Sequence, residues 1–153
     1  EARPRAVHLH PRARAAVDRA RGRTDVDVPV DPQLVERLAR ALESRAVGAL
    51  ATLLADDVWG VVDGGGVVQV ATRPTFGART LVRRFANLSR RVGVPVACRV
   101  VYLNAEPAVL VTLPSAGHMV FASVHVETRG GRIVAMRVVR DPAKLAPLQE
   151  VLQ

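Results

Sequence analysis

Four runs rich in Val and Ala follow one another between residues 96 and 140, and only short turn-forming segments separate them. These segments lie at 104–107, 114–117 and 129–131, and they contain Gly, Pro, Asn and Ser. Consecutive β-like runs joined by short turns predict an antiparallel meander. We expect its strands at 96–103, 108–113, 118–128 and 133–140.

The part of the chain before residue 93 is dominated by helical periodicity. Asp31-Pro32 is a typical helix start, because Asp can accept a backbone N–H at the cap and Pro is tolerated at the first helical position. Apolar residues then recur at helical spacing as far as a corner near Ser44-Arg45. We expect a short second helix at 47–54 and a third at 78–92, which Gly93 would end.

Two further β-like runs, at 58–62 and 67–72, lie between the second and third helices. Asp63-Gly64-Gly65-Gly66 separates these runs, and a glycine-rich segment there predicts a hairpin turn. A second Asp-Pro step, Asp141-Pro142, predicts a terminal helix that runs to about Leu152.

The predicted order of elements is ααββαββββα, without the βαβ alternation of parallel folds. This order indicates an α+β fold: a cone-shaped, strongly curved antiparallel sheet with helices packed on its concave face. A pocket inside the cone is expected. We divide the 153 residues into a basic arm at 1–30 and one domain at 31–153.

Residues 1–23 hold seven Arg against Glu1 and Asp18, so this stretch carries +5 of the net charge of +8. Lys144 is the only lysine, so 21 of the 22 basic residues are Arg. A GC-rich coding sequence explains this bias better than selection for phosphate binding does. Phosphate binding by the clustered Arg of the arm is the alternative explanation. The chain begins at Glu1 and not at Met, so we expect further residues upstream.

Cys98 is the only cysteine, which excludes an internal disulfide, and its apolar surroundings favour a buried thiol over a nucleophile. No apolar run reaches the ~20 residues of a membrane span, and no signal peptide is visible. We therefore expect a cytoplasmic protein with no membrane partner.

Candidate pocket residues are the few aromatic and polar side chains of the predicted strands. His118 and His125 are an odd number apart on one strand, so they should face opposite sides and share no metal. His125 would share a face with Phe121, and Arg137 or Arg140 beside it would make a polar anchor for a ligand. No catalytic residue, cofactor or metal site is predicted. The candidate pocket is Trp59, Tyr102, Phe121, His125 and Arg137.

Four spaced motifs resemble a known family over about residues 32–148. They are Asp63-Gly64-Gly65-Gly66, Arg73-Pro74 with Gly77, Asn104-Ala105-Glu106-Pro107, and Asp141-Pro142-Ala143-Lys144-Leu145. The series is similar to the SnoaL-like (nuclear-transport-factor-like) C-terminal domain of extracytoplasmic-function RNA polymerase sigma factors. Ala105, Asp141 and Ala143 depart from the Gly, Asn and Asp of that family.

The resemblance implies a regulatory domain of transcription initiation that contacts the sigma-factor core domains and RNA polymerase. It implies that promoter DNA is bound only by domains that are absent here. Binding of a small hydrophobic ligand and formation of a homodimer are both compatible with it. The alternative is a free-standing enzyme of this fold, a cyclase, isomerase or hydrolase, or a ligand-binding dimer. The residues expected to contact other domains are Asp63, Gly64, Gly65, Gly66, Asp141, Pro142, Lys144 and Leu145.

Overall fold

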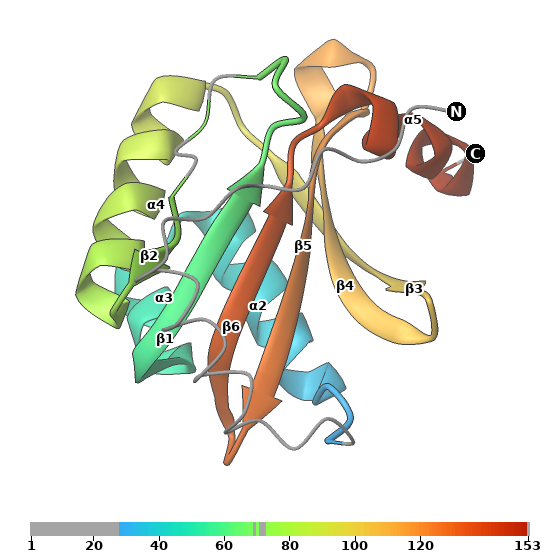
Figure 1. Cartoon of the computed structure of the whole chain (residues 1–153). Coiled ribbons are helices and arrows are strands. Elements are labelled where there is room, and N and C mark those ends of the chain that lie inside the picture. The colour runs from blue at the N-terminus through green and yellow to red at the C-terminus, as the bar shows by residue number, and fades with distance from the viewer. Residues whose placement is uncertain (1–27, 69, 71–72, 153) are drawn as a thin grey trace.

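The computed structural model describes residues 28–68, 70 and 73–152, and these form a mixed α+β fold around a curved sheet (Figure 1). The predicted order of elements is confirmed. The elements are α2 Pro32–Ser44, α3 Val47–Leu53, β1 Leu54–Asp63, β2 Thr75–Phe76, α4 Ala78–Val92, β3 Ala97–Leu103, β4 Glu106–Leu113, β5 Met119–Arg129, β6 Arg132–Val139 and α5 Pro142–Gln149, with short 3-10 helices η1 Pro114–Ala116 and η2 Glu150–Leu152.

The six-stranded sheet has the strand order β2-β1-β6-β5-β4-β3. Strands β3 to β6 form the predicted antiparallel meander. The expectation of a wholly antiparallel sheet is wrong, because β1 pairs with β6 in parallel. Parallel neighbours need a long crossover connection, and here everything from the end of β1 to the start of β6 provides it.

Helix α2 forms where the Asp-Pro step predicts. The Asp31 side chain caps it by accepting a hydrogen bond from the backbone N–H of Gln33 at 2.9 Å. Its apolar stripe, which includes Leu34, Val35 and Leu38, is buried in the main core between the helices and the sheet. Arg45 ends the helix in the left-handed conformation, which makes the corner before α3.

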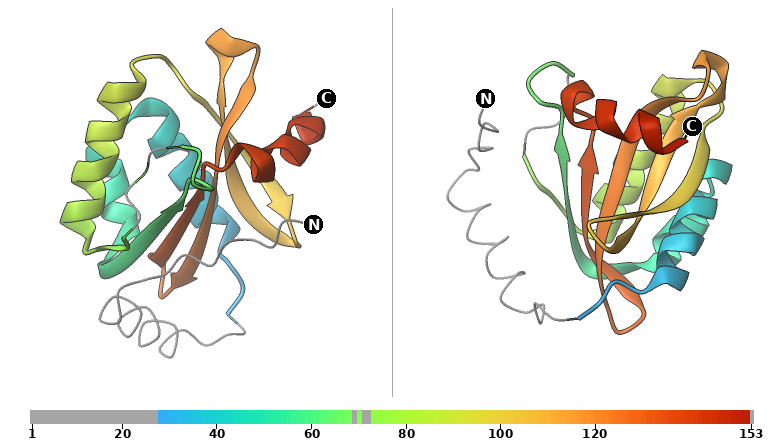
Figure 2. Two further views of the ribbon diagram at one scale, coloured as in Figure 1. Left: turned by 45° about the horizontal axis from the view of Figure 1, so that its top comes forward. Right: turned by 90° about the vertical axis from the view of Figure 1, so that its right-hand side faces the viewer.

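The two faces of the sheet bury different clusters, because side chains alternate along each strand. On β4, Val109 and Val111 join the main core with α2 and α3, whereas Leu110 joins a second cluster with Leu145 of α5. The expectation that all helices pack on one face is therefore wrong for α5, which lies on the opposite face (Figures 1 and 2).

The second predicted strand, at 67–72, is wrong in the residues that the structure describes. The carbonyl oxygen of Gly64 accepts hydrogen bonds from the N–H groups of both Val67 and Val68, at 3.2 and 3.1 Å. After this tight turn, Val67 and Val68 do not pair with β1. The strand that pairs with β1 is the later segment β2. Residues 69, 71 and 72 lie outside the description.

The turn predicted at 104–107 is shorter than expected. Asn104 and Ala105 both adopt positive φ, and such a pair completes a two-residue hairpin turn. Glu106 and Pro107 are consequently free to pair with β3 as the first residues of β4.

Residues 1–27 fall outside the description, so the arm and its boundary at residue 30 remain predictions. In the described part of the chain, no helix is long and apolar enough to cross a membrane.

Candidate functional site

The structure joins the glycine motif to the closing motif at one corner of the surface. We call residues 63–66 and 141–145 the glycine corner. Lys144 Nζ donates to Asp63 Oδ2 at 2.5 Å, across 81 positions of sequence. The backbone N–H of Arg140 donates to the carbonyl oxygen of Asp63 at 2.7 Å. The end of β1 is thereby tied to the start of α5.

Each Asp of the glycine corner also shapes its own turn. Asp63 Oδ1 accepts from the backbone N–H of Gly65 at 2.9 Å, and Asp141 Oδ1 caps α5 by accepting from Ala143 N–H at 3.0 Å. Gly65 has a φ of +64°, and a Cβ there would lie 2.2 Å from the carboxylate carbon of Asp141. Only glycine lets the two turns approach this closely.

The contact with Lys144 favours the ionised form of Asp63. The hydrogen bond from Lys144 lowers the pKa of Asp63, and partial burial opposes that shift. A carboxyl whose pKa is lower in the folded state stabilises the fold at neutral pH, and this contribution is lost as the pH falls through that pKa. The side chains of Asp63 and Lys144 are 28% and 46% exposed. The pair therefore contributes little stability and remains accessible to a partner.

The eight residues predicted to contact other domains fall into distinct environments. Gly66 and Pro142 are exposed, as is Lys144. Gly64 is buried, and a Cβ on it would lie 2.4 Å from the carbonyl oxygen of Val68. Leu145 is buried against Leu110 and Val120, so it anchors α5 to the sheet and has no free surface for a partner.

A cavity of about 480 Å³ lies between α4 and the concave face of the sheet. Helix α4 has the bounds expected from the sequence, 78–92, and its apolar side chains cover the cavity although none of its residues is fully buried. The apolar lining comes from Leu42, Leu50, Leu54, Val61, Val62, Val70, Leu81, Phe85, Leu88, Val92, Val96, Val111, Phe121, Ala122, Val124, Met136 and Val138.

Arg140 brings a positive charge to this apolar cavity. Its guanidinium carbon lies 3.6 Å from the centre of the Phe121 ring, and its Nε donates to the Phe121 carbonyl oxygen at 3.2 Å. Burial lowers the pKa of Arg140, but an arginine remains charged in proteins. Among the residues that the structure describes, no carboxylate lies within ion-pair distance of this guanidinium.

The five residues predicted to line a pocket are not gathered at this cavity. Only Phe121 lines the cavity. Phe121 is the extra residue of a β-bulge, since Val111 pairs with Ala122 but Thr112 pairs with Val120. The bulge turns Phe121 toward the helices and breaks the alternation that was expected to place it beside His125.

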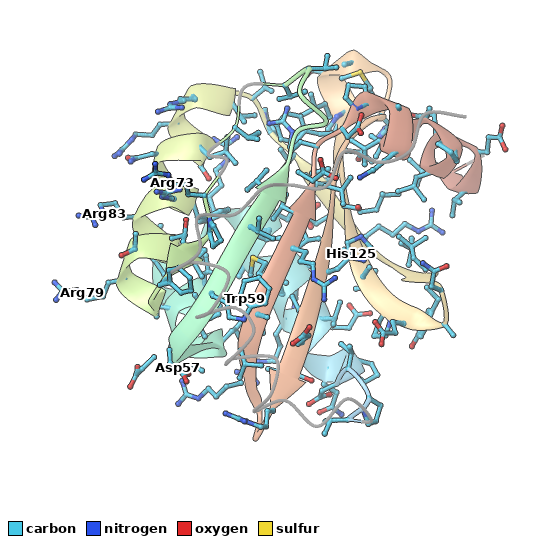
Figure 3. All side chains as sticks on the ribbon, in the orientation of Figure 1. Asp57, Trp59, Arg73, Arg79, Arg83 and His125 are labelled. Atoms are coloured by element: carbon cyan, nitrogen blue, oxygen red, sulfur yellow. The ribbon has the colours of Figure 1, made fainter. Side chains whose placement is uncertain are left out.

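Of the other predicted pocket residues, Trp59, His125 and Arg137 lie on the other face of the sheet, whereas Tyr102 shares the face of Val100 but does not line the cavity. Trp59, only 3% exposed, packs against Ala135, and Figure 3 shows it on the same near face of the sheet as His125. Tyr102 is 66% exposed. Arg137 lies opposite His125 in the sheet, as the sequence suggested, but its guanidinium pairs with Glu127 at 3.0 Å outside the cavity.

His125 is therefore a half-buried histidine of the sheet. Burial lowers its pKa, with Arg137 adding to the shift, so the ring is neutral at physiological pH. Its Nε2 lies 3.0 Å from Ser123 Oγ, which satisfies one ring nitrogen. His118 adopts positive φ just before β5.

The cavity offers no group for acid–base chemistry among the described residues. Its charged lining consists of Arg45, Arg73, Arg84, Arg91 and Arg140, without any Asp, Glu, His, Cys or Lys. General acid–base catalysis needs a side chain that can exchange a proton near neutral pH. Within the described ranges, no group of three His, Cys, Asp or Glu could hold a metal ion.

The sequence analysis named Arg140 as an alternative to Arg137 for a ligand anchor beside His125 but kept only Arg137 in the candidate pocket, although a signal for Arg140 was present. Met136, Val138 and Arg140 recur with period two on β6 and just beyond it, and all three line the cavity. An arginine that continues an apolar row on the buried face of a strand indicates a charge directed into the interior.

Cys98 is partly buried against the main core, and burial raises the pKa of its thiol to about 12, with the Glu43 carboxylate adding to the shift. We expect an aromatic disulfide reagent at pH 8 to label the folded protein at least about 30-fold more slowly than the urea-unfolded chain. The rate of thiolate release measures this. Equal rates in the two states would contradict a thiol held neutral by its surroundings.

No protein-family model matches the chain, and no curated protein matches it in sequence. Solved structures do match. The extracytoplasmic function sigma factor SigJ of Mycobacterium tuberculosis aligns with a TM-score of 0.61 and 23% identity, over 89% of this chain and 51% of SigJ. The chain thus spans about half the length of that sigma factor.

Two bacterial proteins of unknown function share the fold at lower identity. An NTF2-like protein of Pseudomonas putida aligns with a TM-score of 0.53 and 15% identity, over 70% of this chain and 81% of its own. A SnoaL-like protein of Burkholderia thailandensis aligns with a TM-score of 0.53 and 14% identity, over 72% and 97%. These likenesses identify the fold as SnoaL-like and NTF2-like, as the sequence resemblance implies.

Proposed function

We propose that this chain is the regulatory C-terminal domain of an extracytoplasmic-function sigma factor. In this proposal it tunes transcription initiation in the cytoplasm through contacts of the glycine corner with the sigma core domains and RNA polymerase. The observation that carries the proposal is the Asp63–Lys144 pair, which unites the glycine motif with the closing motif at one accessible place. The likeness to SigJ, over half of that protein, supports it at the level of the fold.

The chemistry of the glycine corner suits docking by another polypeptide. Gly66 is exposed and a Cβ there would meet no atom within 4 Å, so bare backbone is open to a neighbour. Beside it, Asp63 and Lys144 offer one negative and one positive group that are only partly desolvated. Such rim charges set the orientation and specificity of an interface more than they set its affinity.

The cavity supports a role in binding over one in catalysis. A free-standing cyclase, isomerase or hydrolase would need a proton-exchanging side chain beside its substrate. The described part of the cavity lining supplies arginines, amides, hydroxyls and apolar groups in place of such a residue.

Charge reversal at Lys144 tests the proposal. In an intact factor that carries this domain, we expect Lys144→Glu to change transcription from the cognate promoter at least about 5-fold, because it places two negative groups together in the glycine corner. The measurement is run-off transcription with purified RNA polymerase. The free energy of unfolding of the isolated domain should change by less than about 1 kcal/mol, as expected for a surface pair.

The matched control is Arg99→Glu, since Arg99 is an exposed arginine of β3 that is not part of the glycine corner. This control should transcribe like the unaltered factor. The proposal is wrong if Lys144→Glu transcribes normally, or if both charge reversals have the same effect.

A further inference from the structure

We propose that the cavity under α4 binds a small amphipathic carboxylate, with its apolar body against α4 and the sheet and its carboxylate on Arg140. The inference rests on the cavity alone, and it holds or fails separately from the proposed role in transcription.

The apolar body of the ligand is specified by the lining. The cavity, at about 480 Å³, lies within the range of about 300–1,000 Å³ that is typical of small-molecule sites. Leu81, Phe85 and Leu88 of α4 direct an apolar stripe toward it, yet no residue of that helix is fully buried. A bound hydrocarbon would remove this stripe from water, which is favourable in proportion to the apolar area covered.

The negative charge of the ligand is specified by Arg140. Stacking on the Phe121 ring and the bond from Nε to the Phe121 carbonyl hold the guanidinium in place. The terminal nitrogens have no carboxylate partner among the described residues, and a guanidinium can donate two parallel hydrogen bonds to one carboxylate. A partly desolvated charge without a counter-ion favours a ligand that brings one.

The rest of the lining carries the same sign of charge. Arg73, Arg84 and Arg91 are exposed residues at the cavity, and no described lining residue is acidic. Arg45 also lines the cavity, but it already donates to the carbonyl oxygen of Val94. Figure 3 shows that Arg79 and Arg83 of α4 point away from the sheet, so they belong to the outer surface. A uniformly positive rim attracts anions and repels cationic amphiphiles.

Decanoate is the probe that tests this assignment, titrated into the domain by calorimetry at pH 8 and below its micelle concentration. We expect one molecule to bind, and decyltrimethylammonium to bind at least about 100-fold more weakly to the same protein. This comparison needs no variant. Equal affinity for decanoate and decyltrimethylammonium, or no binding of decanoate, would overturn the proposal.

Two substitutions assign the binding to the cavity. Arg140→Gln should weaken decanoate at least about 10-fold and leave the binding of decanol unchanged, because a charge-assisted hydrogen bond is lost while the apolar contacts remain. Val138→Phe, which fills the cavity two residues before Arg140, should weaken both. The matched control is Arg99→Gln, which should leave both unchanged. Equal losses of decanoate in Arg140→Gln and Arg99→Gln would refute a role for Arg140.

Discussion

Replacing Gly65 with alanine should lower the free energy of unfolding by about 2–5 kcal/mol. A left-handed backbone costs an L-residue about 1–2 kcal/mol, and overpacking adds about 1–3 kcal/mol. Both apply here, since Gly65 has a φ of +64° and the new Cβ would lie 2.2 Å from the carboxylate carbon of Asp141. Relief of that clash must move Asp141, which caps α5. Urea unfolding followed by circular dichroism measures the loss.

Gly66→Ala is the matched control for this prediction. Gly66 also has a left-handed φ, of +74°, but an added Cβ there would meet nothing within 4 Å. The free energy of unfolding of Gly66→Ala should therefore fall only by the cost of the left-handed backbone, about 1–2 kcal/mol. If the two variants lose the same stability, the close approach of Gly65 to Asp141 has no energetic weight.

The second large effect is expected in the core. Leu38→Ala should lower the free energy of unfolding by about 2–5 kcal/mol, because it removes a side chain that is 0% exposed and leaves a cavity between α2 and the sheet. Leu88→Ala is the comparison, since Leu88 of α4 is 40% exposed at the mouth of the ligand cavity.

The Leu88 substitution should lower the free energy of unfolding by less than about 1 kcal/mol, because its side chain is already partly hydrated. Thermal unfolding of the two variants side by side separates the packed core from the loosely covered cavity. A loss at Leu88 as large as that at Leu38 would mean that α4 is packed as tightly as α2, contrary to the structure.

Local signals predict the elements of this fold well. The Asp-Pro steps at residues 31 and 141 begin α2 and α5, and Gly93 ends α4. Each is a property of a few neighbouring residues: a capping carboxylate, a fixed φ, or a glycine in the left-handed conformation. Such features can be read without knowledge of what the element packs against.

The pairing of β1 is where the sequence prediction fails. The runs flanking Asp63-Gly64-Gly65-Gly66 have the pattern of a hairpin. They do not pair with each other, and β1 pairs in parallel with β6 instead. The competing pairings are equivalent in local composition and differ only in tertiary packing, which overrides strand propensity. The same holds for α5, whose apolar Leu145 could have served either face of the sheet.

For the candidate sites too, local signals were predictable and tertiary contacts were not. The glycine motif and the closing motif were expected, from a family resemblance, to contact other domains, and the structure brings Asp63 and Lys144 of the two motifs into contact with each other. Phe121 was expected to share a face of the sheet with His125, but the bulge at Phe121 places the two side chains on opposite faces. A bulge leaves no trace in an alternating run of apolar residues, so period-two counting placed His125 beside Ser123 but could not show that Phe121 faces the other way.

Arg140 and Asp141 are joined by a single peptide bond. The first holds its guanidinium over Phe121 at the cavity, and the second begins α5 against Gly65 on the surface. Consecutive Cα atoms across a trans peptide are about 3.8 Å apart, and few torsions separate them. The cation at the cavity and the cap of α5 at the glycine corner are therefore neighbours along the chain as well as in the fold.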